Sequence, residues 1–366
     1  MSWCNWSLAG GLSVAGMIDY LTGSIDLPRP LPCPIDGGQF VRVDEYGQVE
    51  LSTARRKRVV GSFEAGMEIR APGVHHLEFQ GNPAKFLQGH NLWGPLDPAE
   101  LLWAALQRME AVGAFPCPLA ALGLFSAASM ANCTSLTRVD CTVMLLADTP
   151  GDVLTSLRSL RVAGRLRDRG KSGLPFPWEK GDGVTFGARP KKTATHRSVT
   201  FYSKGQDVTV HPLPEPMATD FELIDWVNRC LRCEVRLGRN YLRKKGLRPL
   251  CAWTDETALT EWQEMMARID MNGSDEQPAA LAALPAHLHT SYGAWVAGMD
   301  LRSILSKPTF YRHRQAILES VGADIAIPRP KDPIAQVVPI KRIIELRPAG
   351  RPPFADRIER MLSAAA

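Results

Sequence analysis

The sequence lacks an apolar run suited to crossing a membrane, and its cysteines follow no regular spacing. An uncharged stretch does occur at residues 113–131, but Pro116, Pro118 and several Ser and Ala residues disfavour a spanning helix there. The eight cysteines are scattered through 366 residues, a length that can bury a full core without disulfides. We therefore expect reduced thiols, a cytoplasmic location and no membrane partner.

Targeting and zinc-binding features are also missing. Residues 1–16 are apolar and small but carry no basic segment, so they make a poor signal peptide, and Met17 is as good a start as Met1. Cys230 and Cys233 form the single C-x-x-C motif, with no second pair at metal spacing. Cys230 also falls on an apolar helical stripe. The sequence therefore gives little support to a zinc-stabilised interaction module.

Positively charged residues are in small excess. Lys and Arg number 43 against 38 Asp and Glu, which gives a net charge of +5 and a pI near 8.8. That excess alone decides nothing, but the basic residues gather in short clusters, as expected of a protein that binds a phosphate backbone. Each cluster is also compatible with a solvated surface. The clusters are Arg55–Arg58, Arg161–Lys171, Lys191–Lys192, Arg243–Arg248 and Tyr311–Arg314.

The run 198–204 has the alternation of a strand with one polar side. Val199 and Phe201 are apolar, and the residues between and around them are polar. Because strand side chains alternate between faces, Tyr202 and Lys204 are predicted to lie on one face, about 6.5–7 Å apart along the strand. That spacing suits a nucleophile and a cation acting on one phosphate, although a tyrosine on such a strand can equally be a packing residue.

Three other predicted strands carry an acidic side chain on their polar side. Glu78 lies in the run 75–80, Asp140 in 136–144 and Glu234 in 231–237. Arg138 and Arg232 share the polar sides of the last two strands. A sheet with one covered face needs polar groups on the other, so each acid alone is an ordinary surface residue. Their coincidence with Tyr202 is what suggests a site.

The order of predicted elements favours an α+β fold, with one antiparallel sheet and helices packed on its apolar side. A hairpin is expected where 40–43 and 48–51 flank residues 45–47, and an amphipathic helix at 98–112. Alternation stops near Trp253, after which helical spacing takes over. We predict an N-terminal extension at 1–16, a sheet domain at 17–255, a smaller helical DNA-binding or accessory domain at 256–330, and a basic Pro-rich tail with a short helix at 331–366.

Converging carboxylates on the polar face are hard oxygen ligands suited to Mg²⁺ or Mn²⁺. We therefore predict Asp140, Glu234 and Glu78 as metal ligands. Tyrosine, with an ordinary pKa near 10, becomes a good nucleophile at neutral pH only if cations lower that value, and Lys204 and nearby arginines are predicted to do so. These parts allow a transesterification in which Tyr202 attacks a DNA phosphate and the bond energy is kept in the adduct.

Four runs in the same order also resemble a known family. They are LEFQGNPAKFLQGHNLWG at 77–94, TRVDCT at 137–142, SVTFYSKGQ at 198–206 and LRCEVRL at 231–237. They resemble the replication initiators of filamentous phages, the gene II/X family, from about Met17 to about residue 330. The resemblance implies a rolling-circle nickase and strand transferase with a tyrosine nucleophile, for which Tyr202 is in the matching position.

The resemblance also implies partners. They are a double-stranded phage or plasmid origin, the displaced single strand, and a host helicase and polymerase that use the 3′ hydroxyl, in the cytoplasm of a bacterial host. It leaves open whether the chain forms a homo-oligomer. Many rolling-circle nickases bind metal through a His-hydrophobe-His triplet, which occurs here at His287–His289 but outside the predicted sheet.

DNA contacts are predicted at basic and amide side chains beside the site and in the basic clusters. These are Lys85, His90, Asn91, Arg138, Arg232, Arg243, Lys244, Lys245, Arg312 and Arg314. For His90 and Asn91, shaping the loop is the alternative. A different class of function remains open: a non-catalytic, sequence-specific DNA-binding regulator of replication, in which the C-terminal helices read a groove and the sheet is a scaffold.

Overall fold

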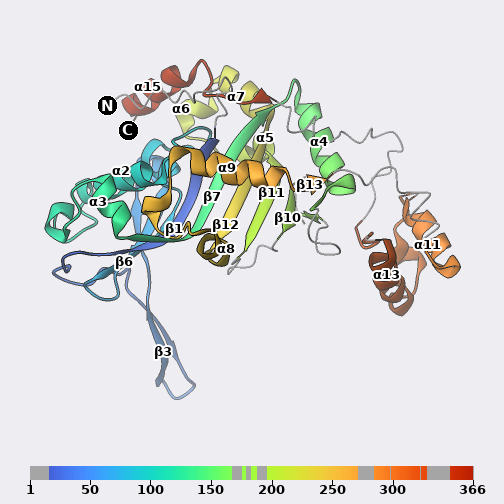
Figure 1. Ribbon diagram of the computed structural model, residues 1–366, viewed down its shortest axis with the longest axis horizontal. Coiled ribbons are helices and arrows are strands. Elements are labelled where there is room, and N and C mark those ends of the chain that lie inside the picture. The colour runs from blue at the N-terminus through green and yellow to red at the C-terminus, as the bar shows by residue number, and fades with distance from the viewer. Residues whose placement is uncertain are drawn as a thin grey trace.

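The computed structural model describes residues 16–166, 175–178, 183–187, 196–270, 284–296, 298–321, 323–327 and 347–365. A twisted sheet forms its centre (Figure 1), and neighbouring strands in it run antiparallel. A short strand, β14 (Arg347–Pro348), adds to the end of β7. In spatial order the strands are β4 (Lys57–Val60), β5 (Gly66–Arg70), β6 (His76–Gly81), β1 (Gly16–Asp26), β7 (Thr134–Leu146), β12 (Cys230–Gly238), β11 (Arg197–Ser203), β10 (Val184–Gly187) and β9 (Phe176–Pro177).

One face of the sheet is apolar and covered by helices, as the alternation predicts. In β7, Val139 and Val143 are buried in the main core, whereas Asp140 points to the other face. Helix α9 (Asp255–Met266) crosses the apolar face (Figure 1), and its Trp262 indole donates a hydrogen bond to the Cys233 sulfur of β12 at 3.2 Å. Helices α2 (Pro98–Ala111), α3 (Ala127–Asn132), α4 (Pro150–Ala163) and α8 (Arg239–Lys245) complete this layer.

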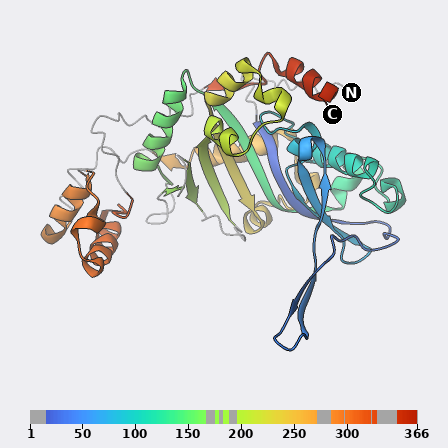
Figure 2. The ribbon, with the colours of Figure 1, turned by 180° about the vertical axis from the view of Figure 1, so that it is seen from behind.

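The opposite face is polar. Figure 2 shows it with no described helix across its centre; α1 (Pro83–Gln88), α5 (Lys204–Val210), α6 (Glu215–Ala218) and α7 (Phe221–Asn228) lie toward one end of the strands. The predicted α+β fold with helices on one face is therefore confirmed. Within the described residues, no helix is long and apolar enough to cross a membrane.

The C-terminal segment returns to the sheet. Helix α15 (Ala355–Ala365) packs beside α6 and α7 in a second apolar cluster that contains Trp93, Trp226 and Ile358. The Trp93 indole donates a hydrogen bond to Glu359 at 3.1 Å, and Arg357 forms an ion pair with Asp220. The described part of the predicted tail is thus held against the sheet domain.

The predicted domain division differs from the structure at residue 255. Helix α9 begins there, but Leu259, Trp262 and Met266 belong to the core of the sheet. Strand β13 (Ile269–Asp270) then pairs with β8 (Arg165–Leu166). The helix was assigned to the second domain because its helical spacing follows the last long strand, and that spacing does not reveal which core a helix joins.

The later helices have a small core of their own. Helices α11 (Ala286–Val296), α12 (Leu301–Ile304) and α13 (Lys307–Val321) bury Leu288, Phe310 and Ile317 together. Figure 1 shows this unit beside the sheet rather than on its covered face.

The predicted hairpin is present and extends away from the sheet (Figures 1 and 2). It consists of β2 (Gln39–Val43) and β3 (Val49–Ala54), nearly all of whose residues are exposed.

Candidate active site

Tyr202 lies near the end of β11 on the polar face, opposite Arg232 of β12. Its side chain is buried, with 8% of its surface exposed. The phenol donates a hydrogen bond of 2.6 Å to Oε1 of Glu234. The ring also lies 5.2 Å from the Trp178 ring, centroid to centroid. Strand alternation therefore brings the predicted tyrosine and one predicted acid into direct contact.

Lys204 does not continue the strand. β11 ends at Ser203, whose hydroxyl accepts the Gln206 amide hydrogen, and Lys204 is the first residue of α5. A serine before a helix satisfies one of the free amides of the first turn, which explains why the strand stops there. The Lys204 ammonium is buried and donates to Asp207 Oδ2 at 2.6 Å and Asn91 Oδ1 at 3.2 Å. Tyr202 and Lys204 still line one cavity. Tyr202 reaches it from the strand face, whereas Lys204 reaches it from the first turn of α5.

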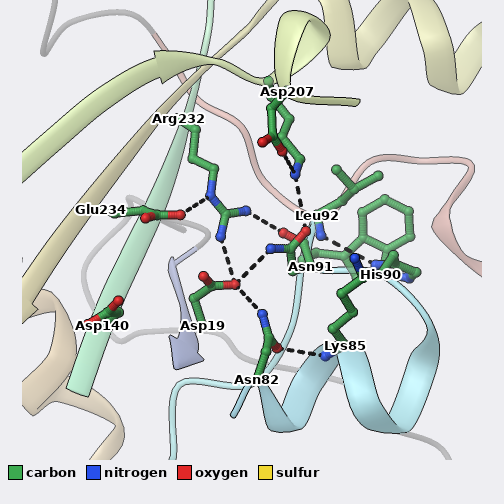
Figure 3. A network of polar contacts seen from close by, with 12 residues as sticks. Asp19, Asn82, Lys85, His90, Asn91, Leu92, Asp140, Asp207, Arg232 and Glu234 are labelled. Carbon is green, nitrogen blue, oxygen red and sulfur yellow. Dashed lines mark hydrogen bonds and ion pairs between the residues drawn. The ribbon is translucent and has the colours of Figure 1, made fainter. Parts of the chain in front are cut away.

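Arg232 is the centre of the polar network in Figure 3. Its guanidinium is fully buried, 2.7 Å from Glu234 Oε1 and 2.7 Å from Asp19 Oδ1. It also donates to the backbone carbonyl of Asn91 at 2.5 Å. Burial at this depth is tolerated for an arginine only when carboxylates and carbonyls replace water. None of the Arg232 surface is exposed, so the structure gives this side chain the role of holding two carboxylates, and its DNA contact stays a prediction.

Asp19 is a member of the network that alternation missed. Regular alternation along β1 would place Asp19 on the same side of the strand as Leu21 and Ile25, which face the core. The structure has a register irregularity between Ile18 and Tyr20, and such a bulge re-aims a side chain. Asp19 accepts hydrogen bonds from Asn82 at 2.6 Å and Asn91 at 2.9 Å (Figure 3). A strand sequence contains no signal for a one-residue bulge.

The amide-rich loop at 82–91 has a structural reason for its composition. Asn82 caps α1 through its side chain, and Pro83 takes the first helical position, where its missing N–H costs nothing. Gly89 ends the helix with φ +80, a conformation that favours glycine. This turn brings Asn91 between Asp19 and Lys204. Asn91 therefore shapes the pocket, which was the alternative to DNA contact.

His90 is also a loop-shaping residue. Its side chain is fully buried and its ring lies 4.4 Å from that of Trp93. Burial, with a smaller effect of the Lys204 charge, lowers the pKa of His90 to about 3, so the imidazole is neutral at physiological pH. A neutral, buried ring offers no charge to a phosphate, so the structure supports the loop-shaping alternative, and the DNA contact of His90 stays a prediction.

The electrostatics of Tyr202 are opposite to the prediction. Burial raises the pKa of Tyr202 well above 10, and Arg232 only partly offsets it, while Glu234 raises it further. Burial also raises the pKa of Glu234; Arg232 opposes this, and the charges of Asp19 and Asp140 add to it. Neighbouring cations thus do not create a standing phenolate. The arrangement instead pairs a neutral phenol with a carboxylate of increased proton affinity.

Asp140 is buried beside this network. Arg138 binds it through both ends of the guanidinium, with Nε at 2.8 Å, and Arg236 Nε lies 3.4 Å away. Arg138 also covers the Tyr20 ring at 4.1 Å. Glu78 belongs elsewhere. It is level with Ser24 on β1, whereas Asp140 is level with Tyr20, and its carboxylate binds Arg70 and Arg56. Glu78 thus lies apart from the Tyr202–Glu234 pair, and its role as a metal ligand stays a prediction.

The carboxylates fit a divalent cation by their chemistry but not as a three-ligand site. No group of three metal-binding side chains is assembled among the residues described. Mg²⁺ commonly takes one or two carboxylates and completes its shell with waters and substrate phosphate. Glu234 lines the cavity, whereas Asp140 is buried, is already bound by Arg138 and Arg236 and is not among the cavity-lining residues, so a cation on both would have to displace these arginines.

The remaining predicted DNA-binding residues are scattered. Lys85 lines the pocket. Residues 243–245 form the end of α8, after the far end of β12, and Lys245 is bound to Glu264 at 2.8 Å. On α13, Arg312 is exposed, but Arg314 forms a two-bond pair with Asp324. Nε and Nη2 of Arg314 both bind Asp324, so this edge of the guanidinium is not available to a base.

The surroundings of the His-hydrophobe-His triplet and of the C-x-x-C motif argue against a metal site at either one. His289 Nε2 lies 2.8 Å from the Leu284 carbonyl oxygen, within the separate helical unit, so His287–His289 is not part of the pocket. Cys230 and Cys233 lie in different apolar clusters on the two faces of β12, which prevents them from sharing a zinc ion.

A cavity of about 130 Å³ collects these groups at the end of β11. The side chains around it include a phenol, an ammonium, carboxylates and imidazoles. They come from Asp19, Lys85, His90, Asn91, Tyr202, Lys204, Asp207, His211 and Glu234. The fold and site thus define an α+β protein whose polar sheet face has a tyrosine bound to a carboxylate, with an ammonium and a buried guanidinium alongside.

The chain belongs to the phage replication-associated protein family of the gene II type, as its resemblance predicted. Residues 17–256 match the N-terminal model of that family and residues 286–357 match the C-terminal one. The replication-associated protein of Enterobacteria phage I2-2 is 31% identical over 359 residues, covering 93% of this chain and 97% of the relative. A solved rolling circle replication initiator protein from Geobacillus stearothermophilus is 10% identical with a TM-score of 0.30, covering 70% of this chain and 86% of that chain.

Proposed function

We propose that this protein initiates rolling-circle replication by nicking the plus strand of a double-stranded origin through Tyr202. The observation that carries the proposal is the 2.6 Å hydrogen bond from the Tyr202 phenol to Glu234, in a cavity that also holds the Lys204 ammonium. A nucleophile, a proton acceptor and a cation are the three parts that a phosphoryl transfer requires. The family and its phage relative support a role in replication.

The reaction balances with these groups. The Tyr202 oxygen forms a bond to phosphorus while its proton passes to Glu234, and the bond between phosphorus and the 3′ oxygen breaks. The departing oxygen takes up a proton from solvent water and becomes a 3′ hydroxyl, which host polymerase can extend while a helicase unwinds the duplex. The DNA 5′ phosphate remains attached to Tyr202. Attack by a later 3′ hydroxyl reverses the step and rejoins the strand.

The raised pKa values suit this scheme. A phenol with a high pKa remains protonated at neutral pH and needs a base, and Glu234 is already in hydrogen-bonding contact. Lys204 lines the same cavity as Tyr202, and its buried charge would stabilise the negative charge that develops on the phosphate oxygens. Mg²⁺ or Mn²⁺, held by Asp140 and Glu234, would supply further positive charge to the phosphate.

Supercoiled plasmid containing the phage origin tests the proposal directly. With Mg²⁺ present, we expect the wild-type chain to yield nicked circles whose 3′ ends a polymerase extends. Digestion and mass spectrometry of the protein bound to the 5′ end should identify the peptide that contains Tyr202. An adduct on another tyrosine would assign the nucleophile elsewhere. Binding without any nicking would favour the regulator in place of the enzyme.

Glu234→Gln should lower the nicking rate by about 10²-fold, because general-base catalysis typically contributes that much or more. The pH dependence gives a sharper readout. Glu234 acts as a base only when deprotonated, so the wild-type rate should fall as pH decreases through its pKa, which burial raises and a bound cation would lower. The variant should lose this acid limb. Glu78→Gln, at a carboxylate bound to Arg56 and Arg70, is the matched control and should keep the wild-type profile.

Asp140→Asn tests the metal. Titration of Mn²⁺ monitored by electron paramagnetic resonance, without DNA, should show binding weakened by at least about tenfold. Glu78→Gln should bind Mn²⁺ as the wild type does, because its carboxylate lies with Arg56 and Arg70. Equal Mn²⁺ affinity in Asp140→Asn and wild type would remove Asp140 from the metal site.

A further inference from the structure

The polar face continues beyond the candidate active site to the opposite edge of the sheet. Arg138 covers Tyr20 in its middle, and Arg70 of β5 faces the same way, bound to Glu78 of β6. Arg56 reaches Glu78 as well, at 3.0 Å. The face therefore presents arginines from the Tyr202 pocket to the β4–β5 edge.

A second, larger cavity lies at this edge, with a volume of about 810 Å³. It is lined by five cationic side chains and by a single carboxylate, that of Glu68; the cations are Arg55, Arg56, Lys57, Arg58 and Arg70. Lys57 and Arg58 donate to carbonyl oxygens rather than to carboxylates, so their charges are not neutralised by these contacts. Arg56 Nε is buried and lacks a hydrogen-bond partner within the described chain. This basic cavity fits a group with several anionic oxygens.

The β2–β3 hairpin extends from the sheet edge that carries the basic cavity (Figure 2). Its base is closed by backbone hydrogen bonds from Gly37 to Arg55 at 2.9 Å and from Arg55 to Gly38 at 2.8 Å. Beyond the base the ribbon is exposed, including the large side chains of Phe40 and Tyr46, at 50% and 81%. A two-stranded ribbon has the cross-section that the major groove of B-DNA admits.

We propose that the basic cavity binds the phosphate backbone of duplex origin DNA beside the nick, with the β2–β3 hairpin in the adjoining groove. This inference rests on the proposed function and extends it to a duplex-binding site separate from the Tyr202 pocket. From β11 to β5 is five strand spacings, which at roughly 4.8 Å each is about 24 Å. That span corresponds to about seven base pairs at roughly 3.4 Å per pair.

The positive charge at the base of the hairpin favours a nucleic acid over a protein as the binding partner there. Arg55–Arg58 add four positive charges within four residues and Arg70 adds a fifth, against Glu68 in the cavity lining and Glu78, which pairs with Arg56 and Arg70. The acidic residues Asp44, Glu45 and Glu50 belong to the outer part of the hairpin, where Arg42 already pairs with Glu50. The backbone contact is therefore assigned to the base, and the groove contact to the uncharged side chains above it.

Quantitative binding to a labelled origin duplex at several salt concentrations tests the site, using chains with Tyr202→Phe so that no cleavage intervenes. Arg55→Ala with Arg58→Ala should weaken duplex binding at least tenfold at low salt. Each phosphate contact contributes about 0.9 to the slope of log affinity against log salt, so that slope should fall by about 1.8. Arg108→Ala with Arg158→Ala, two exposed arginines on the covering helices α2 and α4, is the matched control.

The hairpin is tested by replacing residues 39–54 with Asn-Gly, a pair suited to a two-residue turn between Gly38 and Arg55. Hydroxyl-radical footprinting should then lose protection about seven base pairs from the cleavage position. Unchanged protection would overturn the groove contact and indicate that the hairpin serves a protein partner. An unchanged salt slope in the arginine variant would overturn the backbone site.

The same two variants, made with Tyr202 intact, should cleave a single-stranded origin oligonucleotide at the wild-type rate, which shows that they are folded and that the basic cavity is not part of the chemistry. Failure of the proposed function gives a different result. The wild type would then cleave neither duplex origin DNA nor the single-stranded oligonucleotide, while the arginine variant would still bind duplex DNA more weakly than the parent chain does.

Discussion

Tyr202→Phe is expected to lower origin nicking by at least about 10⁴-fold and to eliminate the covalent protein–DNA adduct, since removal of a nucleophile is among the costliest changes in an active site. Phenylalanine keeps the ring against Trp178 and the burial, and loses only the oxygen that attacks phosphorus. Duplex binding should therefore remain. The measurement is a nicking time course on supercoiled origin DNA, together with a denaturing gel for the adduct.

Tyr241→Phe is the matched control for this substitution. Tyr241 also donates a 2.6 Å hydrogen bond to a glutamate, Glu261, and accepts one from Arg197, but it lies on α8 beside the main core. It should keep the wild-type nicking rate and adduct. If Tyr202→Phe forms the adduct as well as this control does, Tyr202 is not the nucleophile.

Arg232→Met should destabilise the folded chain by about 3–5 kcal/mol, the usual effect of removing one partner from a buried ion pair. The side chain is completely buried, so Asp19 and Glu234 lose their principal partner in a site where little of either carboxylate is exposed to water. Urea unfolding followed by circular dichroism measures the change. Arg229→Met, which breaks an exposed pair with Asp225, should cost less than about 1 kcal/mol.

The destabilisation should depend on pH with a definite sign. Burial alone would raise the pKa of Asp19, but Arg232 and the Asn91 hydrogen bond lower it overall below its ordinary value of 3.8. The stability that this carboxylate contributes is therefore present above pH 3.8 and is lost as pH falls through the lowered pKa. The difference between wild type and Arg232→Met should be full at neutral pH and shrink in acid. A constant difference would show that lost packing, and not charge, is responsible.

Strand alternation predicted much of the sheet because its period is set by the backbone. Val199, Phe201 and Tyr202 take the sides that their positions indicate, and the same holds for Asp140 and Glu234. The hairpin around residues 45–47 was predicted for a related reason, as turn-forming residues separate two alternating runs.

The predictions that failed depend on a local helix cap at Lys204 and on longer-range effects elsewhere. Lys204 left the strand because Ser203 caps a helix, and His90 and Arg232 are basic residues whose burial no local pattern reveals. Glu78 has the same alternation as Asp140, but its strand register places it beside Arg56 and Arg70. For His90, Arg232 and Glu78, the surroundings and partners brought together by the fold decided the role.

The sequence by itself therefore determined the α+β class, the family and the pairing of a strand tyrosine with acids on one sheet face. Only the tertiary structure decided that Asp19 joins them through a bulge, that Arg232 is buried between two carboxylates, and that Tyr202 is a protonated phenol bound to Glu234. The physical reason is that side-chain alternation is local, whereas register, desolvation and charge pairing depend on residues far apart in the chain.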